Sequence, residues 1–344
     1  MIAVLKEGIL LQKTNTDFEN EGVLNPAAIR DGEQVHLLYR AVQKGNRSSI
    51  GYCLLNGPLF IEKRNHTPLL SPEFDYESQG LEDPRLVKID DTYYLTYTAY
   101  DGINALGCLA TSKDLISFEK KGIIVPQITY EEFIKLAEVD KTVSEKYFRY
   151  NQHQHIVEEE GVKKLLWDKN LIFFPRKING KLFFLHRIKP DIQIVVGIES
   201  IDELTPLFWN NYLLHYQDYL ILKPKYRHEV SYTGGGCPPI ETDKGWLVIY
   251  HGVHDTLQGY VYSACAAMLD IESPQKEIAR LPYPLFFPEF HWELKGEVNN
   301  VCFPTGAVVF DDRLYIYYGA ADERIACASV CLSELVNELM LNKI

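Results

Sequence analysis

Residues 89–101 read IDDTYYLTYTAYD, and this phrase decides the fold because variants of it recur along the chain. Each variant has a turn containing Asp, Asn or Gly, followed by a short apolar and aromatic strand that ends near Tyr or His. The other four are RDGEQVHLLYRA from Arg30, INGKLFFLHRI from Ile178, TDKGWLVIYHGV from Thr242 and FDDRLYIYYGAAD from Phe310. A second strand follows each of them. Such repeated strand–turn–strand units predict an all-β fold, a five-bladed β-propeller rather than a single sandwich.

Three segments fall outside the repeats. Residues 1–24 are expected to supply a closing strand to the last blade. Residues 127–165 lengthen the connection between the second and third copies and predict a helical insertion, and the tail from Leu332 (LSELVNELMLNKI) predicts a helix that covers a blade edge. Because no Ser/Gly-rich linker or low-complexity segment interrupts the sequence, residues 1–344 are expected to form one domain.

Composition limits the classes of function. The 344 residues are 46% hydrophobic, enough for a large core, and 12% aromatic, which suits both β structure and sugar stacking. A formal net charge of −12 and the lack of a Lys/Arg-rich run argue against nonspecific nucleic-acid binding. A small anionic substrate is still compatible, because a local cationic pocket can form in an acidic protein.

Cysteine usage and the first residues favour a cytoplasmic protein. The seven cysteines are an odd number without C-x-x-C spacing, and several lie in small-residue strands, so we expect reduced, buried thiols. The start MIAVLKEGILLQKTN has no signal-peptide pattern, and no apolar run is long enough for a membrane helix, so no membrane partner is expected. The histidines are scattered without metal-ligand spacing, and no metal is expected.

GLEDPRL, residues 80–86, is the sharpest candidate for a catalytic phrase. Pro84 predicts an extended conformation for Asp83, with Arg85 two residues on and on the same side. Asp83, next to Glu82, is a candidate proton donor, because a neighbouring carboxylate raises one pKa while Arg85 opposes that shift. The alternative is a structural Asp83 that caps a turn and pairs with Arg85.

Polar residues at the ends of the repeated strands form a second candidate set. If these strands line a central channel, their ends converge from distant positions in the sequence. Hydrogen bonding inside single blades is the alternative for any one of them. The run TGGGC at residues 233–237 is interpreted as a tight backbone crossing, with close approach of a ligand left open. The convergent set is Arg40, Asp101, His186, Arg187, His251 and Asp322, and Tyr250, beside His251, is a further substrate-binding candidate.

Together, these phrases resemble glycoside hydrolase family 130, the β-mannoside phosphorylases and β-mannosidases built on a five-bladed propeller. The resemblance runs from LNPAAI at residue 24 through EDPRL, HRIKPDI and GGGCPPI to YYGAAD at residue 322. It implies an inverting enzyme that cleaves short β-mannosides, usually β-1,2-linked, with Asp83 as the general acid acting through a sugar hydroxyl. It also places Asn25, Arg40, Ser49, Asp101, His186, Arg187 and Asp322 in phrases that line the sugar site.

The nucleophile is left open between phosphate and water. Phosphorylases of this family often carry Lys before the Gly-rich run, whereas this chain has Tyr232 there and Glu229 three residues earlier. This difference favours hydrolysis with Glu229 as the base. Inorganic phosphate would otherwise be the co-substrate and the product would be mannose 1-phosphate, with no other cofactor. The phosphate-binding candidates are Arg85, Lys169, Arg176 and His251.

A glycan-binding propeller without catalytic activity is the competing hypothesis, since fold does not fix function. The partner in either case is a small oligosaccharide. Homo-oligomer formation is left open by the sequence.

Overall fold

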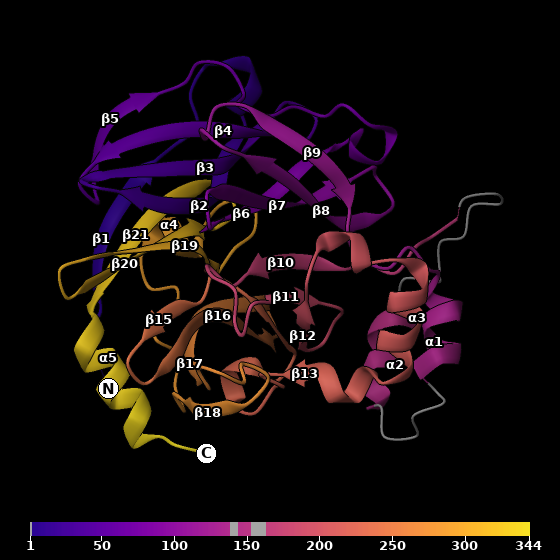
Figure 1. Cartoon of the computed structure of the whole chain (residues 1–344). Helices are drawn as coiled ribbons and strands as arrows, with labels where there is room; N and C mark the ends of the chain where they lie inside the picture. The colour runs from indigo at the N-terminus through magenta and orange to yellow at the C-terminus, as the bar shows by residue number, and fades with distance from the viewer. Residues whose placement is uncertain (1, 138–143, 153–162) are drawn as a thin grey trace.

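The computed structural model describes residues 2–137, 144–152 and 163–344. The described chain is mostly β structure, as the repeats predict, and its strands form four sheets (Figure 1). The largest sheet consists of two antiparallel units that are joined by a single parallel bridge between Ser48 and Gly80. The described strands therefore fall into five antiparallel units.

Four units are continuous in the sequence, and the fifth uses both ends of the chain. The first unit holds β2 (Gly22–Asp31), β3 (Gln34–Gln43), β4 (Arg47–Asn56) and β5 (Phe60–Arg64), and the second holds β6 (Gly80–Ile89), β7 (Thr92–Tyr100), β8 (Ala105–Ser112) and β9 (Phe118–Ile123). The third holds β10 (Lys169–Phe173), β11 (Leu182–Arg187), β12 (Ile192–Ile198) and β13 (Leu220–Ile221). The fourth holds β14 (Tyr232–Gly235), β16 (Gly245–Thr256), β17 (Gly259–Leu269) and β18 (Glu277–Arg280), with β15 (Ile240–Thr242) beside β16. The fifth holds β19 (Cys302–Phe310), β20 (Arg313–Ala320), β21 (Arg324–Cys331) and β1 (Leu5–Leu11).

The repeated sequence phrases lie on the second strand of each unit, which is β3, β7, β11, β16 or β20. The N-terminal strand β1 pairs antiparallel with β21, from Leu5 opposite Ser329 to Leu11 opposite Ile325. The expected closing strand from the start of the chain is thereby confirmed.

Hydrophobic clusters fill the space between consecutive units. Leu38 of β3 belongs to one cluster with Leu95 of β7, and further clusters join the second unit to the third, the third to the fourth and the fourth to the fifth. A fifth cluster contains Tyr39 of β3 and Tyr317 of β20, so it joins the last unit back to the first. The five units therefore pack as a closed ring.

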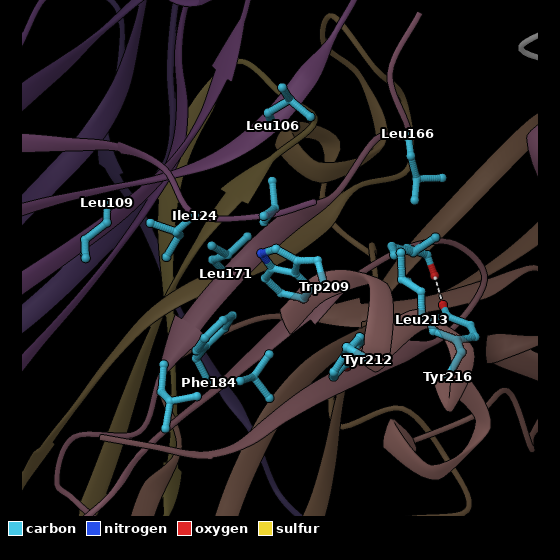
Figure 2. Packing of buried hydrophobic residues seen from close by; sticks show 14 of the residues in the cluster. Leu106, Leu109, Ile124, Leu166, Leu171, Phe184, Trp209, Tyr212, Leu213 and Tyr216 are labelled. Carbon is cyan, nitrogen blue, oxygen red and sulfur yellow. Dashed lines mark hydrogen bonds between the residues drawn. The ribbon is translucent and has the colours of Figure 1, made fainter. Parts of the chain in front are cut away.

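Helices cover the outside of this ring. Helices α1 (Tyr130–Ala137) and α2 (Glu145–Gln152) lie in the predicted insertion, while α3 (Pro206–Leu214) was not predicted. The three gather on one side of the molecule (Figure 1). Trp209 and Tyr212 of α3 pack near Leu171 and Phe184 of the third unit (Figure 2). Short helical turns complete the list: η1 (Asp17–Glu19), η2 (Asp75–Glu77), η3 (Ile201–Glu203), η4 (Tyr216–Tyr219), η5 (Arg227–Glu229) and α4 (His291–Leu294).

The predicted C-terminal helix is present as α5 (Leu332–Leu341). Its residues Leu335, Val336 and Leu339 are buried in the cluster between the fourth and fifth units. All seven cysteines are free and all but Cys331 are buried, as expected. Among the described helices, none has the length and apolar character needed to cross a membrane.

A buried glutamate recurs in front of the first strand in four of the units. Each is 0–2% exposed and lies in a short helical turn. Its carboxylate accepts a hydrogen bond from a tyrosine of the unit's second strand and pairs with a cation from the unit's fourth strand. Each buried charge is thereby compensated, as burial requires. The four triads are Glu19–Tyr39–Arg64, Glu77–Tyr97–Lys120, Glu229–Tyr250–Arg280 and Glu293–Tyr318–Lys6.

The triad of the fifth unit gives a test of this constraint. Replacing Lys6 with Met leaves the Glu293 carboxylate, which is 0% exposed, without its cation. Breaking a buried ion pair from one side costs about 3–5 kcal/mol, so K6M lowers the free energy of unfolding by that amount. Urea denaturation followed by tryptophan fluorescence measures the loss.

Lys13 provides the matched control for this experiment. It pairs with Glu323 at 3.4 Å, but its side chain is 49% exposed, so K13M changes the free energy of unfolding by less than about 1 kcal/mol. Equal losses in K6M and K13M would show that the buried triad contributes nothing special. The double variant K6M/E293Q recovers part of the stability that K6M loses, because the unpaired buried charge is then removed.

Candidate active site

A cavity of about 230 Å³ lies where the first strands of all five units meet. The sequence had suggested that the second strands are innermost, and the lining shows that the first strands contribute more. The second strands provide only Arg40, Arg187 and, just beyond β20, Asp322. The remaining lining residues are Asn25, Glu82, Asp83, Trp167, Lys169, Asn170, Lys189, Tyr232, Tyr262, Val301 and Phe303.

β-Bulges aim three of these side chains into the cavity. The pairing register shifts between Leu24 and Ala27 in β2, between Glu82 and Arg85 in β6, and between Lys169 and Ile172 in β10. Inside these shifts Asn25, Asp83 and Asn170 have φ values of 50°, 50° and 55°. Asn and Asp tolerate this left-handed conformation better than other non-glycine residues. The predicted extended conformation of Asp83 was therefore wrong, because the bulge inserts a residue before Pro84.

The acidic wall of the cavity consists of Glu82, Asp83 and Asp322, with Arg40 between them. Asp83 Oδ1 accepts a hydrogen bond of 2.7 Å from Asn25 Nδ2 and lies 3.7 Å from Arg40 Nη1. Arg40 Nη2 lies 2.9 Å from Glu82 Oε1. The guanidinium thus bridges two neighbouring carboxylates and fixes both.

The two aspartates of the acidic wall have opposite pKa shifts. Burial by itself raises the pKa of Asp83, but the charges of Arg40 and Arg85 and the Asn25 hydrogen bond outweigh it and hold the pKa below its usual value. Burial, together with the negative charge of Asp83, raises the pKa of Asp322 to about 6. At neutral pH without ligand, Asp83 is therefore ionised, and Asp322 takes up a proton at only slightly lower pH.

The cationic wall consists of Lys169, Arg187 and Lys189. Lys169 pairs with Glu82 at 3.3 Å, whereas Arg187 and Lys189 form no ion pair with any residue in the described ranges. They lie over the ring of Tyr232 instead, at 5.5 Å and 4.2 Å from its centroid. Burial and the neighbouring charges of Arg187 and Lys169 lower the pKa of Lys189 to about 7.

Two buried donors at this wall lack acceptors. Arg187 Nε and Asn170 Nδ2 have no hydrogen-bond partner among the described residues. A buried hydrogen-bond donor without an acceptor costs free energy. Unpaired donors next to cations that have no carboxylate partner are therefore expected to bind an anion with several oxygen atoms. The cavity therefore has one wall that binds hydroxyl groups and another that binds an anion.

Comparison with known proteins identifies the family. The sequence model of glycoside hydrolase family 130, described as beta-1,4-mannooligosaccharide phosphorylase, matches residues 8–341. The chain belongs to glycoside hydrolase family 130. It is thus a carbohydrate-active enzyme that acts on β-mannosides, which removes the hypothesis of a glycan-binding propeller without catalytic activity.

Two relatives and one solved structure are similar to this family 130 enzyme over nearly its whole length. The 1,2-beta-oligomannan phosphorylase of Thermoanaerobacter sp. strain X514 is 35% identical, covering 95% of this chain and 96% of the relative. The beta-1,2-mannobiose phosphorylase of the same strain is 33% identical, covering 91% of each chain. The structure of the Listeria innocua beta-1,2-mannobiose phosphorylase with beta-1,2-mannobiose has a TM-score of 0.73 at 21% identity, covering 99% of this chain and 100% of that one.

The structure brings six of the predicted site residues of this family 130 enzyme to the cavity, namely Asn25, Arg40, Asp83, Lys169, Arg187 and Asp322. Arg85 and His251 lie behind the lining. Arg85 is 1% exposed and donates to the carbonyl oxygens of Asp83, Pro84 and Gly236, so its donors are already used. Burial and the charge of Arg187 hold the pKa of His251 well below its usual value, so its imidazole brings no positive charge for phosphate.

The surroundings of Glu229 correct its assignment as a catalytic base. Its carboxylate is completely buried, accepts from Tyr250 and pairs with Arg280 at 3.1 Å. Glu229 and Tyr250 belong, with Arg280, to one of the four structural triads. In the third unit, His186 takes the place on the second strand that Tyr250 has in the fourth unit. Its imidazole forms hydrogen bonds to Asp168 at 2.7 Å and to Tyr212 at 2.8 Å. None of these three predicted residues lines the cavity.

Three further predictions are corrected by position. Asp101 accepts from the backbone of Ile103 and Asn104, so it closes a turn. Arg176 forms an exposed ion pair with Glu241 at 2.7 Å. Ser49 is not among the lining residues, whereas its neighbour Ser48 accepts from Arg40 Nε at 2.9 Å. Ser48 is not among the lining residues either, so β4 reaches the site through this hydrogen bond to Arg40.

Sequence reasoning missed Lys189, although HRIKPDI contained the signal. Arg187 ends β11 and Lys189 follows two residues later in the turn before Pro190, so the end of the strand and its turn bring both cations to the cavity. The glycine run is explained by packing, as the tight crossing predicted. A Cβ on Gly234 would overlap His251, and one on Gly236 would lie 2.5 Å from Ile249 O.

One group of described residues has metal-ligating atoms close together: those of His228, Glu229 and Cys265 lie within 4.8 Å of one another. It lies outside the cavity lining. Arg280 already places a positive charge beside Glu229, which disfavours a metal cation there.

Gly319 leads to a test of the acidic wall. A Cβ at this position would overlap Asn25 Oδ1, so Gly319→Ala displaces the amide that donates to Asp83. Losing this hydrogen bond raises the pKa of Asp83, because the bond stabilises the ionised form. Carbon-13 NMR titration of the Asp83 carboxyl measures the shift. Asn25→Ala should shift the pKa in the same direction, and a lower pKa in either variant would contradict the assignment.

Proposed function

We propose that this enzyme is a β-1,2-mannoside phosphorylase that transfers a mannosyl unit to inorganic phosphate with inversion. The observation that carries the proposal is the cationic wall, where Arg187 and Lys189 have no carboxylate partner in the described chain and the Arg187 Nε and Asn170 Nδ2 donors are unpaired. A water nucleophile needs no such wall, whereas a phosphate does.

The closed ring of five antiparallel units supports a five-bladed β-propeller as the scaffold. In such a fold the sheets surround a central channel, and the innermost strand of each blade lines it. The lining of the cavity by the first strand of each unit agrees with that arrangement. The similarity to the Listeria innocua structure over almost the full chain supports the same scaffold.

The linkage comes from the relatives. The family model is described by activity on β-1,4-linked mannooligosaccharides, but the 35% and 33% identical relatives are named for β-1,2-linked substrates. Since these relatives match the chain from end to end, the β-1,2 linkage is the better supported choice.

The Asp83 side of the cavity supplies the proton. The bond from C1 of the mannosyl unit to the leaving oxygen breaks, a bond from C1 to a phosphate oxygen forms, and the proton of Asp83 goes to the leaving oxygen, through a sugar hydroxyl as the family resemblance implies. Asp83 is ionised in the free enzyme, and phosphate bound nearby adds negative charge that raises its pKa, so that Asp83 takes up a proton from solvent before the step. Substrate binding thus prepares the acid.

Hydrolysis with inversion would need a base on the sugar face opposite the acid, and the described lining has no free carboxylate on the cationic wall. Glu229 is unavailable in its buried triad, and Glu82 is held by both Arg40 and Lys169. Among the described lining residues Asp322 remains, and its pKa of about 6 would suit a base. It lies on the acidic wall, however, which is the same side as the acid and not the opposite face. Phosphate needs no base, because its anionic oxygen is already a nucleophile.

Replacing Asp83 with Asn removes the proton donor while keeping the size of the side chain. General acid catalysis typically contributes about 10²–10⁴-fold, so D83N lowers kcat by at least that range while thermal unfolding shows an intact fold. Asp101→Asn, at the turn-closing aspartate outside the cavity, is the matched control and keeps turnover. Full activity in D83N would remove Asp83 from the mechanism.

Phosphate dependence separates the two nucleophiles. β-1,2-Mannobiose with inorganic phosphate is expected to give mannose 1-phosphate and mannose, and without phosphate no cleavage. Lys189→Met raises the KM for phosphate by about tenfold, the loss of one charged hydrogen bond. Release of free mannose only, whether or not phosphate is present, would establish hydrolysis.

The pH dependence of this KM has a definite sign. Lys189 binds phosphate as the cation, so the wild-type KM for phosphate rises as the pH increases through about 7, where Lys189 loses its proton. Lys189→Arg stays charged and flattens that rise. Lys177→Met, at an exposed lysine paired with Asp90, is the control and leaves the profile unchanged.

A further inference from the structure

A second hollow of about 310 Å³ adjoins the cavity. Arg40 and Asp322 line both spaces. The other lining residues come from the start of β2, the end of β3, the turn between β3 and β4, and the segment before β19. They are Glu21, Gly22, Leu24, Val42, Asn46, Glu297 and Val298. The second hollow therefore lies where the first and fifth units meet.

The lining of the second hollow suits a neutral, hydroxyl-rich ligand. Carboxylates of Glu21 and Glu297 and the amide of Asn46 can bind hydroxyl groups. Leu24 and Val298 offer apolar surface, which matches the C–H faces of a sugar. Arg40 is its single cation among the lining residues in the described chain, and Glu82 already binds it. An anion would meet mainly carboxylates here, so the second hollow complements the cationic wall.

The direction of attack decides which end of the substrate enters the second hollow. Lys169, Arg187 and Lys189 line only the first cavity. In an inverting displacement the nucleophile and the leaving group lie on opposite faces of the sugar. A nucleophile at the cationic wall therefore sends the leaving oxygen toward Asp83 and the acidic wall, which opens past Arg40 and Asp322 into the second hollow.

Size supports the same assignment. The first cavity, at about 230 Å³, is smaller than the range of about 300–1,000 Å³ that is typical of ligand pockets. One mannosyl unit and a phosphate occupy most of it, so the first leaving unit lies at the boundary formed by Arg40 and Asp322, and any further units need the adjoining space.

The geometry points to the second hollow as the subsite for the leaving oligosaccharide beyond its first unit: the first leaving mannosyl unit touches Arg40 and Asp322, and the units that follow it toward the reducing end occupy the second hollow. It selects for longer substrates in cleavage and for longer acceptors in synthesis. This inference rests on the proposed function for the direction of attack. Water attacking from the cationic wall would give the same assignment.

Filling the second hollow tests the inference. Val298 is 41% exposed, so Val298→Trp adds bulk there without disturbing the core. With mannose 1-phosphate as donor, V298W should lower kcat/KM for β-1,2-mannobiose and mannotriose as acceptors by about tenfold or more, and for mannose by less than about threefold. Glu297→Gln should also lower kcat/KM for mannobiose and mannotriose more than for mannose, by a smaller factor than V298W.

Val196→Trp is the matched control, because Val196 is a valine of similar exposure, 36%, on β12 and lines neither space. It keeps the wild-type ratio between acceptors. An unchanged ratio in V298W, or an equal loss for all acceptors including mannose, would overturn the inference. If the enzyme makes no use of mannose 1-phosphate, the proposed function fails separately, and hydrolysis of mannobiose against mannotriose gives the same comparison of chain lengths.

Discussion

The buried glutamate is the constraint on which the ring depends. In four units a carboxylate that water cannot reach joins the segment before the first strand to a tyrosine of the second strand and a cation of the fourth. Because an uncompensated buried charge is so costly, each unit is complete only when its first, second and fourth strands are all in place. In the fifth unit that cation is Lys6, so the beginning and the end of the chain must meet before the last carboxylate is satisfied.

A second buried charge connects this scaffold to the cavity. Arg85 is 1% exposed and has no carboxylate salt bridge in the described chain, and its donors reach carbonyl oxygens of β6 and of the glycine run after β14. It therefore fixes the bulge that holds Asp83 and at the same time ties the second unit to the fourth. Its charge also keeps the pKa of Asp83 low. A residue that the sequence suggested as a phosphate ligand thus acts on Asp83 from behind the cavity lining.

The sequence predicted the repeated units, the closing strand, the C-terminal helix and the family, because these follow from local patterns. It also identified Asp83 and Arg40, and both line the cavity. Prediction from the sequence failed where the interaction partner of a residue lies far away in the sequence. Tyr250 and Glu229 looked like site residues, and only the position of Arg280 shows that they serve the unit itself. The left-handed conformation of Asp83 was equally hidden, since a bulge depends on the neighbouring strand.

The division of charge inside the ring makes the phosphate binding that we propose compatible with an acidic protein. The triads neutralise the deepest carboxylates within each unit, so they add no net charge to the centre. At the cavity, the cations Arg40, Lys169, Arg187 and Lys189, with Arg85 behind them, outnumber the three carboxylates of the acidic wall. A phosphate dianion balances that excess, and a neutral sugar does not. In the proposed mechanism, the cations that attract phosphate also keep Asp83 ionised until phosphate is bound.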